Sequence, residues 1–213
     1  KRRRLREQAR REYERAVNLT GHAQARAALA GLRRQEERDT LIAEGDAARK
    51  AGQWELALQK YGQAAERGSS EALSEKILDV RFQIPLRKAE DLRRQKKYDE
   101  AQKQYEIAMQ VKPSERSDIE VRIGRMRQQE RYETYIAAGD AALAKGNYAD
   151  AKENFQKARG TRVNEDEAVA RLAEVDYREN LAKGQREQAR GNLEFARGYY
   201  RLAREAKDTE EIQ

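Results

Sequence analysis

Small residues and aromatic rings recur in a fixed order along this chain of 213 residues, and the segment 136–158 shows that order most fully. Ala151, Phe155 and Ala158 are spaced by four and three residues, so they lie on one face of a predicted helix. A Gly-Asn turn precedes that helix, and Gly139 lies on the helix before the turn. Small residues let two helices approach closely, and aromatic rings fill the space beside them. The segment therefore predicts two antiparallel helices joined by a tight turn, a helical hairpin.

The same order returns in the rest of the chain, beginning with half a copy around Tyr13. Eight of the 14 aromatic residues fall at just two positions of the pattern, which alanine-rich helices would not produce by chance. The structural positions on the second helix of each hairpin are Trp54, Ala57 and Tyr61, then Tyr98, Ala101 and Tyr105, then Tyr148, Ala151 and Phe155, and in a weaker copy Ala196 and Tyr200.

This pattern resembles the tetratricopeptide repeat (TPR), whose first helix carries small residues and whose second helix has an aromatic, Ala, an aromatic and Ala. The resemblance covers almost the whole chain. It implies an all-α fold, a right-handed α-solenoid of antiparallel helical hairpins. It also implies a single domain, with a half repeat over 1–20 and repeats over about 22–68, 70–112, 114–160 and 164–208.

The repeats are longer than those of the family. Corresponding alanines of successive copies are 44 to 50 residues apart, whereas the family repeat has about 34 residues. The additional residues have helical composition, and no stretch rich in Gly or Pro is present to hold them as a loop. We expect overlong first helices that extend beyond the second helices. The alternative is a separate short helix in each repeat.

Turn residues and caps predict where several helices begin and end. The pattern predicts second helices over 54–67 and 98–111. We expect Pro85 to kink or break its long helix, because proline lacks an N–H donor and clashes with the preceding turn. Ser114 is predicted to cap the helix that follows it. The two remaining predictions concern the ends of the chain: a turn over 18–21, and the start of a further helix at 208–211, so that the chain would start and stop within the solenoid.

The composition favours a helical protein without a membrane-spanning segment of its own. Charged residues make up 39% of the chain and hydrophobic residues 38%, with two prolines and no cysteine. No run of about 18 apolar residues is present. The lack of cysteine fits a reducing compartment, and we expect a cytoplasmic location. Since the chain has neither an initiator Met nor a signal peptide, we expect it to be part of a longer protein.

The net charge of +7 is concentrated in residues 1–34, which carry eleven basic and three acidic residues. The basic N-terminal patch consists of Lys1, Arg2, Arg3, Arg4 and Arg6. Three interpretations stay open: a solvated helix end, the cytoplasmic flank of a membrane tether upstream of Lys1, or contact with anionic lipid or nucleic acid. Nucleic acid is the least favoured partner, because no aromatic residues are interleaved with this cluster.

The sequence contains no recognisable catalytic or cofactor-binding motif. His22 is the only histidine and cysteine is absent, so a zinc site would depend almost entirely on carboxylates. No phosphate-binding loop or dinucleotide fingerprint is present. Acidic residues accompany Lys and Arg at helical spacings, which is typical of solvated ion pairs. We therefore expect no enzymatic activity, no cofactor, no metal and no small-molecule substrate.

The resemblance implies a peptide-binding groove lined by the first helices. The groove-facing positions would be Ile42, Asp46 and Arg49, then Leu86, Glu90 and Arg93, then Ile136 and Asp140, and finally Leu181 and Gln185. Some family members hold a C-terminal carboxylate there with Lys and Asn, whereas this chain has an apolar row beside an acidic row. Such rows would suit a peptide with apolar anchors and basic residues. In the alternative, the overlong helices move these rows into the core or onto an ordinary surface.

The functional hypothesis is a non-catalytic scaffold that binds a partner protein or peptide. Two alternatives follow from the same pattern. The unfinished hairpins at the two ends could stack copies of the chain end to end, as a self-assembling structural unit. The chain could instead be the cytoplasmic region of a membrane-anchored signalling protein, such as a bacterial receptor.

Overall fold

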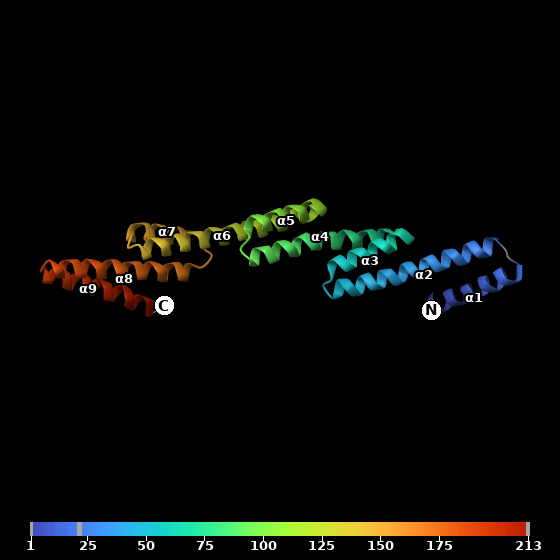
Figure 1. Cartoon of the computed structure of the whole chain (residues 1–213), viewed down its shortest axis with the longest axis horizontal. Coiled ribbons are helices and arrows are strands. Elements are labelled where there is room, and N and C mark those ends of the chain that lie inside the picture. The colour runs from blue at the N-terminus through green and yellow to red at the C-terminus, as the bar shows by residue number, and fades with distance from the viewer. Residues whose placement is uncertain (1, 21–22, 212–213) are drawn as a thin grey trace. The chain divides into compact units, whose positions relative to one another are not determined.

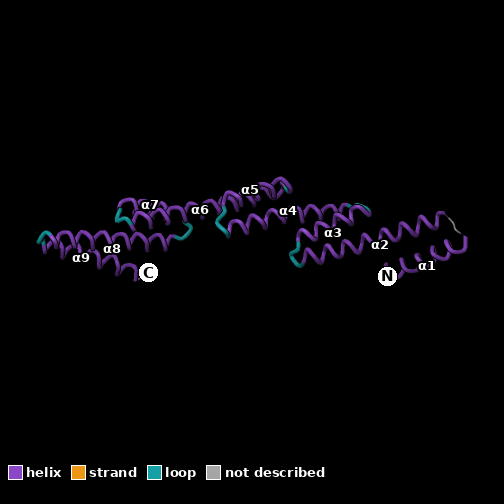
Figure 2. Tube along the Cα trace, in the orientation of Figure 1, coloured by secondary structure: helices purple, strands orange, loops and turns teal. Residues whose placement is uncertain are grey.

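A computed structural model describes residues 2–20 and 23–211, and the predictions for Lys1 and His22 lie outside the described residues. Every regular element of the described part is a helix, and Figures 1 and 2 show their order along the chain. The elements are α1 (Arg2–Thr20), α2 (Ala23–Lys50), α3 (Trp54–Arg67), α4 (Glu71–Arg94), α5 (Tyr98–Val111), the 3-10 turn η1 (Pro113–Glu115), α6 (Arg116–Ala144), α7 (Tyr148–Gly160), α8 (Glu165–Ala189) and α9 (Leu193–Glu211).

Long and short helices alternate from α2 onward. The long helices α2, α4, α6 and α8 have 28, 24, 29 and 25 residues. The short helices α3, α5 and α7 have 14, 14 and 13 residues, and α9 has 19. Each long helix is one continuous element. The extra residues of each repeat therefore lengthen the first helix and do not form a separate short one.

The chain divides into two compact units, residues 1–119 and 120–213, and the boundary falls within α6. In the first unit, α1 packs on α2, α2 on α3, α3 on α4, and α4 on α5, so consecutive helices lie side by side (Figure 1). In the second unit, α7 packs on α8 and α8 on α9. The part of α6 in this unit contacts α7, where the Gly139 backbone meets the ring of Phe155.

The core of the first unit lies between α2, α3 and α4. Its central residue is Tyr61, which is 0% exposed and surrounded by Ala48, Ala57, Ala64, Leu73 and Val80. In the second unit, Phe155 is likewise 0% exposed and packs with Leu143, Ala151 and Val175. A ring from the short helix thus fills the same kind of space in both units, and alanines surround it on the short helix itself.

The four turns between a long helix and the following short one have the same hydrogen-bond pattern. In the first, Gln53 N–H donates to the Ala48 carbonyl at 2.9 Å and Gly52 N–H to the Arg49 carbonyl at 3.1 Å, which is the Schellman arrangement. The turn requires a left-handed residue, and Gly52, Gly146 and Gly191 fill this place with φ of 75°, 72° and 82°. Lys96 fills it in the α4–α5 turn with φ of 61°.

The predicted second helices over 54–67 and 98–111 are confirmed as α3 and α5. Several other boundary predictions are wrong. The predicted break at Pro85 is absent, because α4 continues through this buried residue. Residues 18–20 of the predicted turn continue α1, and Gly21 lies outside the described residues. Residues 208–211 continue α9 instead of starting a new helix. Ser114 lies inside η1 and does not cap α6. Local breaker and capping signals are weak predictors, which tertiary packing can override.

Candidate partner-binding surface

Asp46, which follows Gly45 on α2, forms its hydrogen bonds within the chain. Tyr61 Oη donates a hydrogen bond to Asp46 Oδ1 at 2.6 Å, and Lys76 of α4 donates to the same oxygen. Burial opposes the charged carboxylate, yet the bonds from Lys76 and Tyr61 hold the pKa of Asp46 below its ordinary value. Burial, together with the bond to Asp46, raises the pKa of Tyr61 to about 12. Asp46 thus links α2, α3 and α4.

The next helix pair repeats this contact. Tyr105 Oη donates to Glu90 Oε1 at 2.6 Å, and Arg93 Nε donates to Glu90 Oε2 at 3.0 Å. The bond to Glu90 keeps the pKa of Arg93 above its ordinary value, although burial acts in the opposite direction. Ala89, which corresponds to Gly45, is 0% exposed like the ring of Tyr105. The acidic residue again serves the interface between a long and a short helix.

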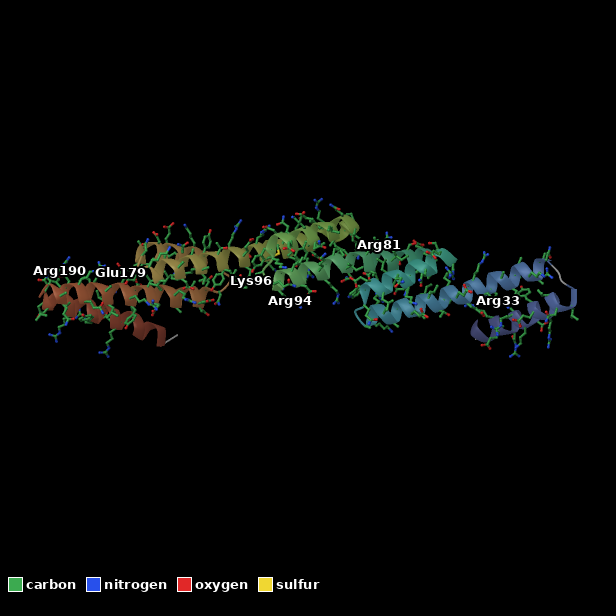
Figure 3. The ribbon with its side chains drawn as sticks, viewed as in Figure 1. Arg33, Arg81, Arg94, Lys96, Glu179 and Arg190 are labelled. Carbon is green, nitrogen blue, oxygen red and sulfur yellow. The ribbon has the colours of Figure 1, made fainter. Side chains whose placement is uncertain are left out.

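In the second unit, the corresponding acidic residue is Asp140 of α6, and its partner lies on the following long helix, α8. Phe155 has no hydroxyl, and Asp140 of α6 accepts a bond from Arg171 Nη1 of α8 at 2.6 Å. The amine of Lys152 on α7 reaches Asp176 and Glu179 of α8, both at 2.6 Å. Figure 3 shows Glu179 on α8. These pairs hold three consecutive helices of the unit together.

The remaining groove-facing positions are divided between the core and the surface. Ile42 packs against the core of the first unit, and Ile136 against that of the second. Arg49 forms an ion pair with Asp79 at 3.4 Å. Leu86 and Leu181 are half-buried, whereas Gln185 is exposed. Most members of the predicted apolar and acidic rows therefore make contacts inside their own unit.

The structural positions on the short helices differ in how deeply they are buried. Tyr61, Tyr105 and Phe155 are each 0% exposed. Trp54 is half-buried beneath the guanidinium of Arg87, which lies 4.7 Å from the ring centroid. Residues Tyr98, Ala57, Ala101, Ala151 and Ala196 are also buried, whereas Tyr148 and Tyr200 are half-buried.

The basic N-terminal patch is described only in part. Lys1 lies outside the described residues, and the side chains of Arg2, Arg3 and Arg4 are not among those described. Arg6 forms an ion pair with Asp39 of α2, and Arg10 pairs with Glu36 at 3.8 Å. Arg6 therefore joins α1 to α2.

An open cleft in the first unit was not predicted as a site. It has a volume of about 590 Å³ and lies along the first half of α2 and the end of α3. Its lining includes Arg26, Arg33 and Arg34, together with Leu29 and Ala30. The spacing of seven and eight residues places the three arginines on one face of a helix. That spacing is visible in the sequence and could have identified a basic face on this helix, but not the part of the cleft that α3 lines.

The described residues contain neither a metal site nor a helix suited to span a membrane. Within 2–20 and 23–211, no cluster of three His, Cys, Asp or Glu side chains could hold a metal ion. Over the same residues, no helix combines the length and the apolar character that crossing a membrane requires.

Comparison with known proteins adds no relative. No protein-family model matches the chain, and no curated protein is significantly similar to it. The resemblance to the tetratricopeptide repeat therefore depends on the residue pattern alone.

Proposed function

We propose that the chain is a non-catalytic protein-binding scaffold, built as a TPR-like, right-handed α-solenoid of antiparallel helical hairpins. The observation that carries the proposal is the recurrence of one interface. A ring of the short helix packs against Gly45, Gly139 or Gly184 of the preceding long helix, where an added Cβ would lie 2.5–2.6 Å from the ring. Repeated helix pairs of this kind build extended surfaces, and such surfaces commonly bind other proteins.

The contacts between α2 and α3 support the antiparallel arrangement. Lys60 pairs with Glu44 at 2.7 Å, and Arg67 pairs with Glu37 at 3.6 Å. As the residue number rises along α3, the number of its partner on α2 falls. The same order is expected of any hairpin closed by a Schellman turn.

The experiment begins with affinity capture by the purified chain, followed by titration of each captured protein against the chain in pure form. We expect at least one saturable one-to-one complex. The matched control is Tyr61→Asp, which places a charge at the centre of the core and unfolds the surface. A captured protein that binds this control equally well, or the absence of any saturable complex, would contradict the proposal.

The exposed face of α9 favours self-association as a second candidate function. Leu193 and Phe195 are 66% and 68% exposed, and Leu202 is 44% exposed. Phe195 and Leu202 are seven residues apart, so they lie on one side of the helix. Sedimentation at increasing concentration tests this function. A dimer that the substitution Phe195→Ser abolishes would support it, and a persistent monomer would exclude it.

A further inference from the structure

The cleft along α2 carries an excess of positive charge that nothing in the described part of the chain neutralises. Arg26, Arg33 and Arg34 are exposed, and within residues 2–20 and 23–211 none of the three makes an ion pair. Figure 3 shows Arg33 on α2. Three exposed arginines without a carboxylate partner among the described residues thus lie at one cleft, where they are available to bind an external anion.

The far end of the cleft limits what kind of anion can enter. Arg67 there pairs with Glu37 at 3.6 Å and with Glu66 at 3.3 Å, so this end already has its own carboxylates. A nucleic-acid strand carries a phosphate at every nucleotide and would meet these acidic residues. A short protein segment with a few carboxylates could bind at the arginines without meeting these acidic residues.

The floor of the cleft is apolar between the arginines. Leu29 is half-buried and Ala30 is exposed, and both lie between Arg26 and Arg33 along α2. A helix rises 1.5 Å per residue, so Arg26 and Arg34 are about 12 Å apart along its axis. In an extended peptide, side chains two and four residues apart lie on one face, and residues four apart span about 13 Å. An apolar side chain between two acidic ones would meet the leucine while its neighbours meet the arginines.

We infer that this cleft binds an acidic protein segment in which an apolar side chain lies between two carboxylate-bearing groups. The inference rests on the proposed scaffold function and adds the chemistry of the partner and its place on the chain. It concerns side chains within the segment and not a free C-terminal carboxylate. The groove predicted from the sequence would instead favour basic peptides.

The test uses a fluorescein-labelled, C-terminally amidated peptide of sequence Ser-Glu-Glu-Ala-Leu-Glu-Glu-Ser and the full chain. Anisotropy should rise to saturation, and the affinity should fall as salt is added, because screening weakens exposed charge pairs. The variant Arg33→Glu/Arg34→Glu should bind at least about tenfold more weakly. The single variant Arg26→Glu should also bind more weakly.

The matched control is Arg81→Glu/Arg131→Glu, which makes the same change in net charge at two exposed arginines of other long helices. This variant should bind the peptide like the unchanged chain, and a peptide with Lys in place of Glu should not bind. Circular dichroism checks that all variants are folded.

Several results would overturn the inference. One is the absence of saturable peptide binding, and another is an equal loss of peptide affinity in the two double variants. A third is that the chain binds a 12-nucleotide single strand, or vesicles containing phosphatidylserine, more tightly than the peptide. A captured protein partner that Arg33→Glu/Arg34→Glu binds normally would also overturn it. In that last case the scaffold function would stand, with its site elsewhere on the chain.

Discussion

The ring of Tyr61 occupies the space that a side chain at position 45 would need. A Cβ added to Gly45 would lie 2.5 Å from Cε1 and 2.6 Å from Cδ1 of this ring. Gly139 stands in the same relation to Phe155, and Gly184 to Tyr200, at 2.5 and 2.6 Å. The chain therefore uses glycine inside three long helices, five residues before each ends, although glycine there costs about 1 kcal/mol relative to alanine. The neighbouring ring leaves no room for a methyl group.

The first prediction is that Gly45→Ala destabilises the first unit. The added methyl must displace a fully buried ring that is also hydrogen-bonded to Asp46, and such overpacking costs about 1–3 kcal/mol. The gain in helix propensity, about 1 kcal/mol, offsets only part of this cost. Urea unfolding followed by circular dichroism measures the difference. The control is Gly62→Ala on α3, where nothing lies within 4 Å of the added Cβ and the variant should be stabilised. Equal stabilisation of both variants would show that the ring is not held where we describe it.

The second prediction concerns the hydroxyl of Tyr61. The change Tyr61→Phe keeps the buried ring and removes the hydrogen bond to Asp46, so unfolding should require about 1 kcal/mol less. The same change made in an Asp46→Ala background should cost less, because the acceptor is already absent. Equal costs in the two backgrounds would mean that the two side chains are not coupled.

The third prediction is a loss of stability in alkali. Burial and the bond to Asp46 raise the pKa of Tyr61 to about 12, whereas tyrosine in the unfolded chain titrates near 10. Between these values the unfolded chain loses a proton that the folded chain keeps, so stability falls as the pH rises. Burial and the bond to Glu167 also raise the pKa of Tyr132. Urea midpoints measured from pH 9 to 12 should fall less steeply for Tyr61→Phe. An unchanged slope would contradict the shift.

The fourth prediction concerns the α4–α5 turn. Lys96 adopts φ of 61°, the left-handed region in which a non-glycine residue costs about 1–2 kcal/mol. Lys96→Gly should therefore raise the urea midpoint of the first unit. In the equivalent α2–α3 turn, where Gly52 has φ of 75°, the reverse change Gly52→Lys should lower it. If both changes lower the midpoint, the side chain of Lys96 contributes more than its backbone costs.

The sequence predicted the positions of the helices well and a break at Pro85 wrongly. The bounds of α3 and α5 were correct because Trp54 and Tyr98 begin amphipathic segments that follow tight turns. Pro85 was expected to break or kink α4, yet the helix continues, because packing against neighbouring helices stabilises it beyond local propensity. A single proline therefore predicted less about this helix than its apolar pattern did.

The candidate site was harder to predict than the fold. Acidic residues at positions 46, 90 and 140 were assigned to a groove because the resemblance to the tetratricopeptide repeat implies one. Their actual partners, Tyr61, Tyr105 and Arg171, lie 15, 15 and 31 residues further along the chain. Spacing along one helix cannot show which neighbouring helix supplies the partner of a side chain. The same holds for the three arginines of the cleft. Only the tertiary structure shows that they have no ion-pair partner among the described residues.

The central claim is that each short helix lies along the long helix before it, in one register. Cross-linking of the native chain by a zero-length carbodiimide, read out by mass spectrometry, tests this most directly, because the reagent joins an amine only to a carboxylate in contact with it. We predict a link from Lys60 of α3 to Glu44 of α2, whose charged atoms are 2.7 Å apart. Links from Lys152 of α7 to Asp176 and Glu179, at 2.6 Å, report separately on the packing of α7 against the following helix α8. The pair Lys157 and Glu153 within α7, 2.6 Å apart, serves as the positive control. If the control link forms while the link from Lys60 to Glu44 is absent, the two helices do not pack in this register and the account is wrong.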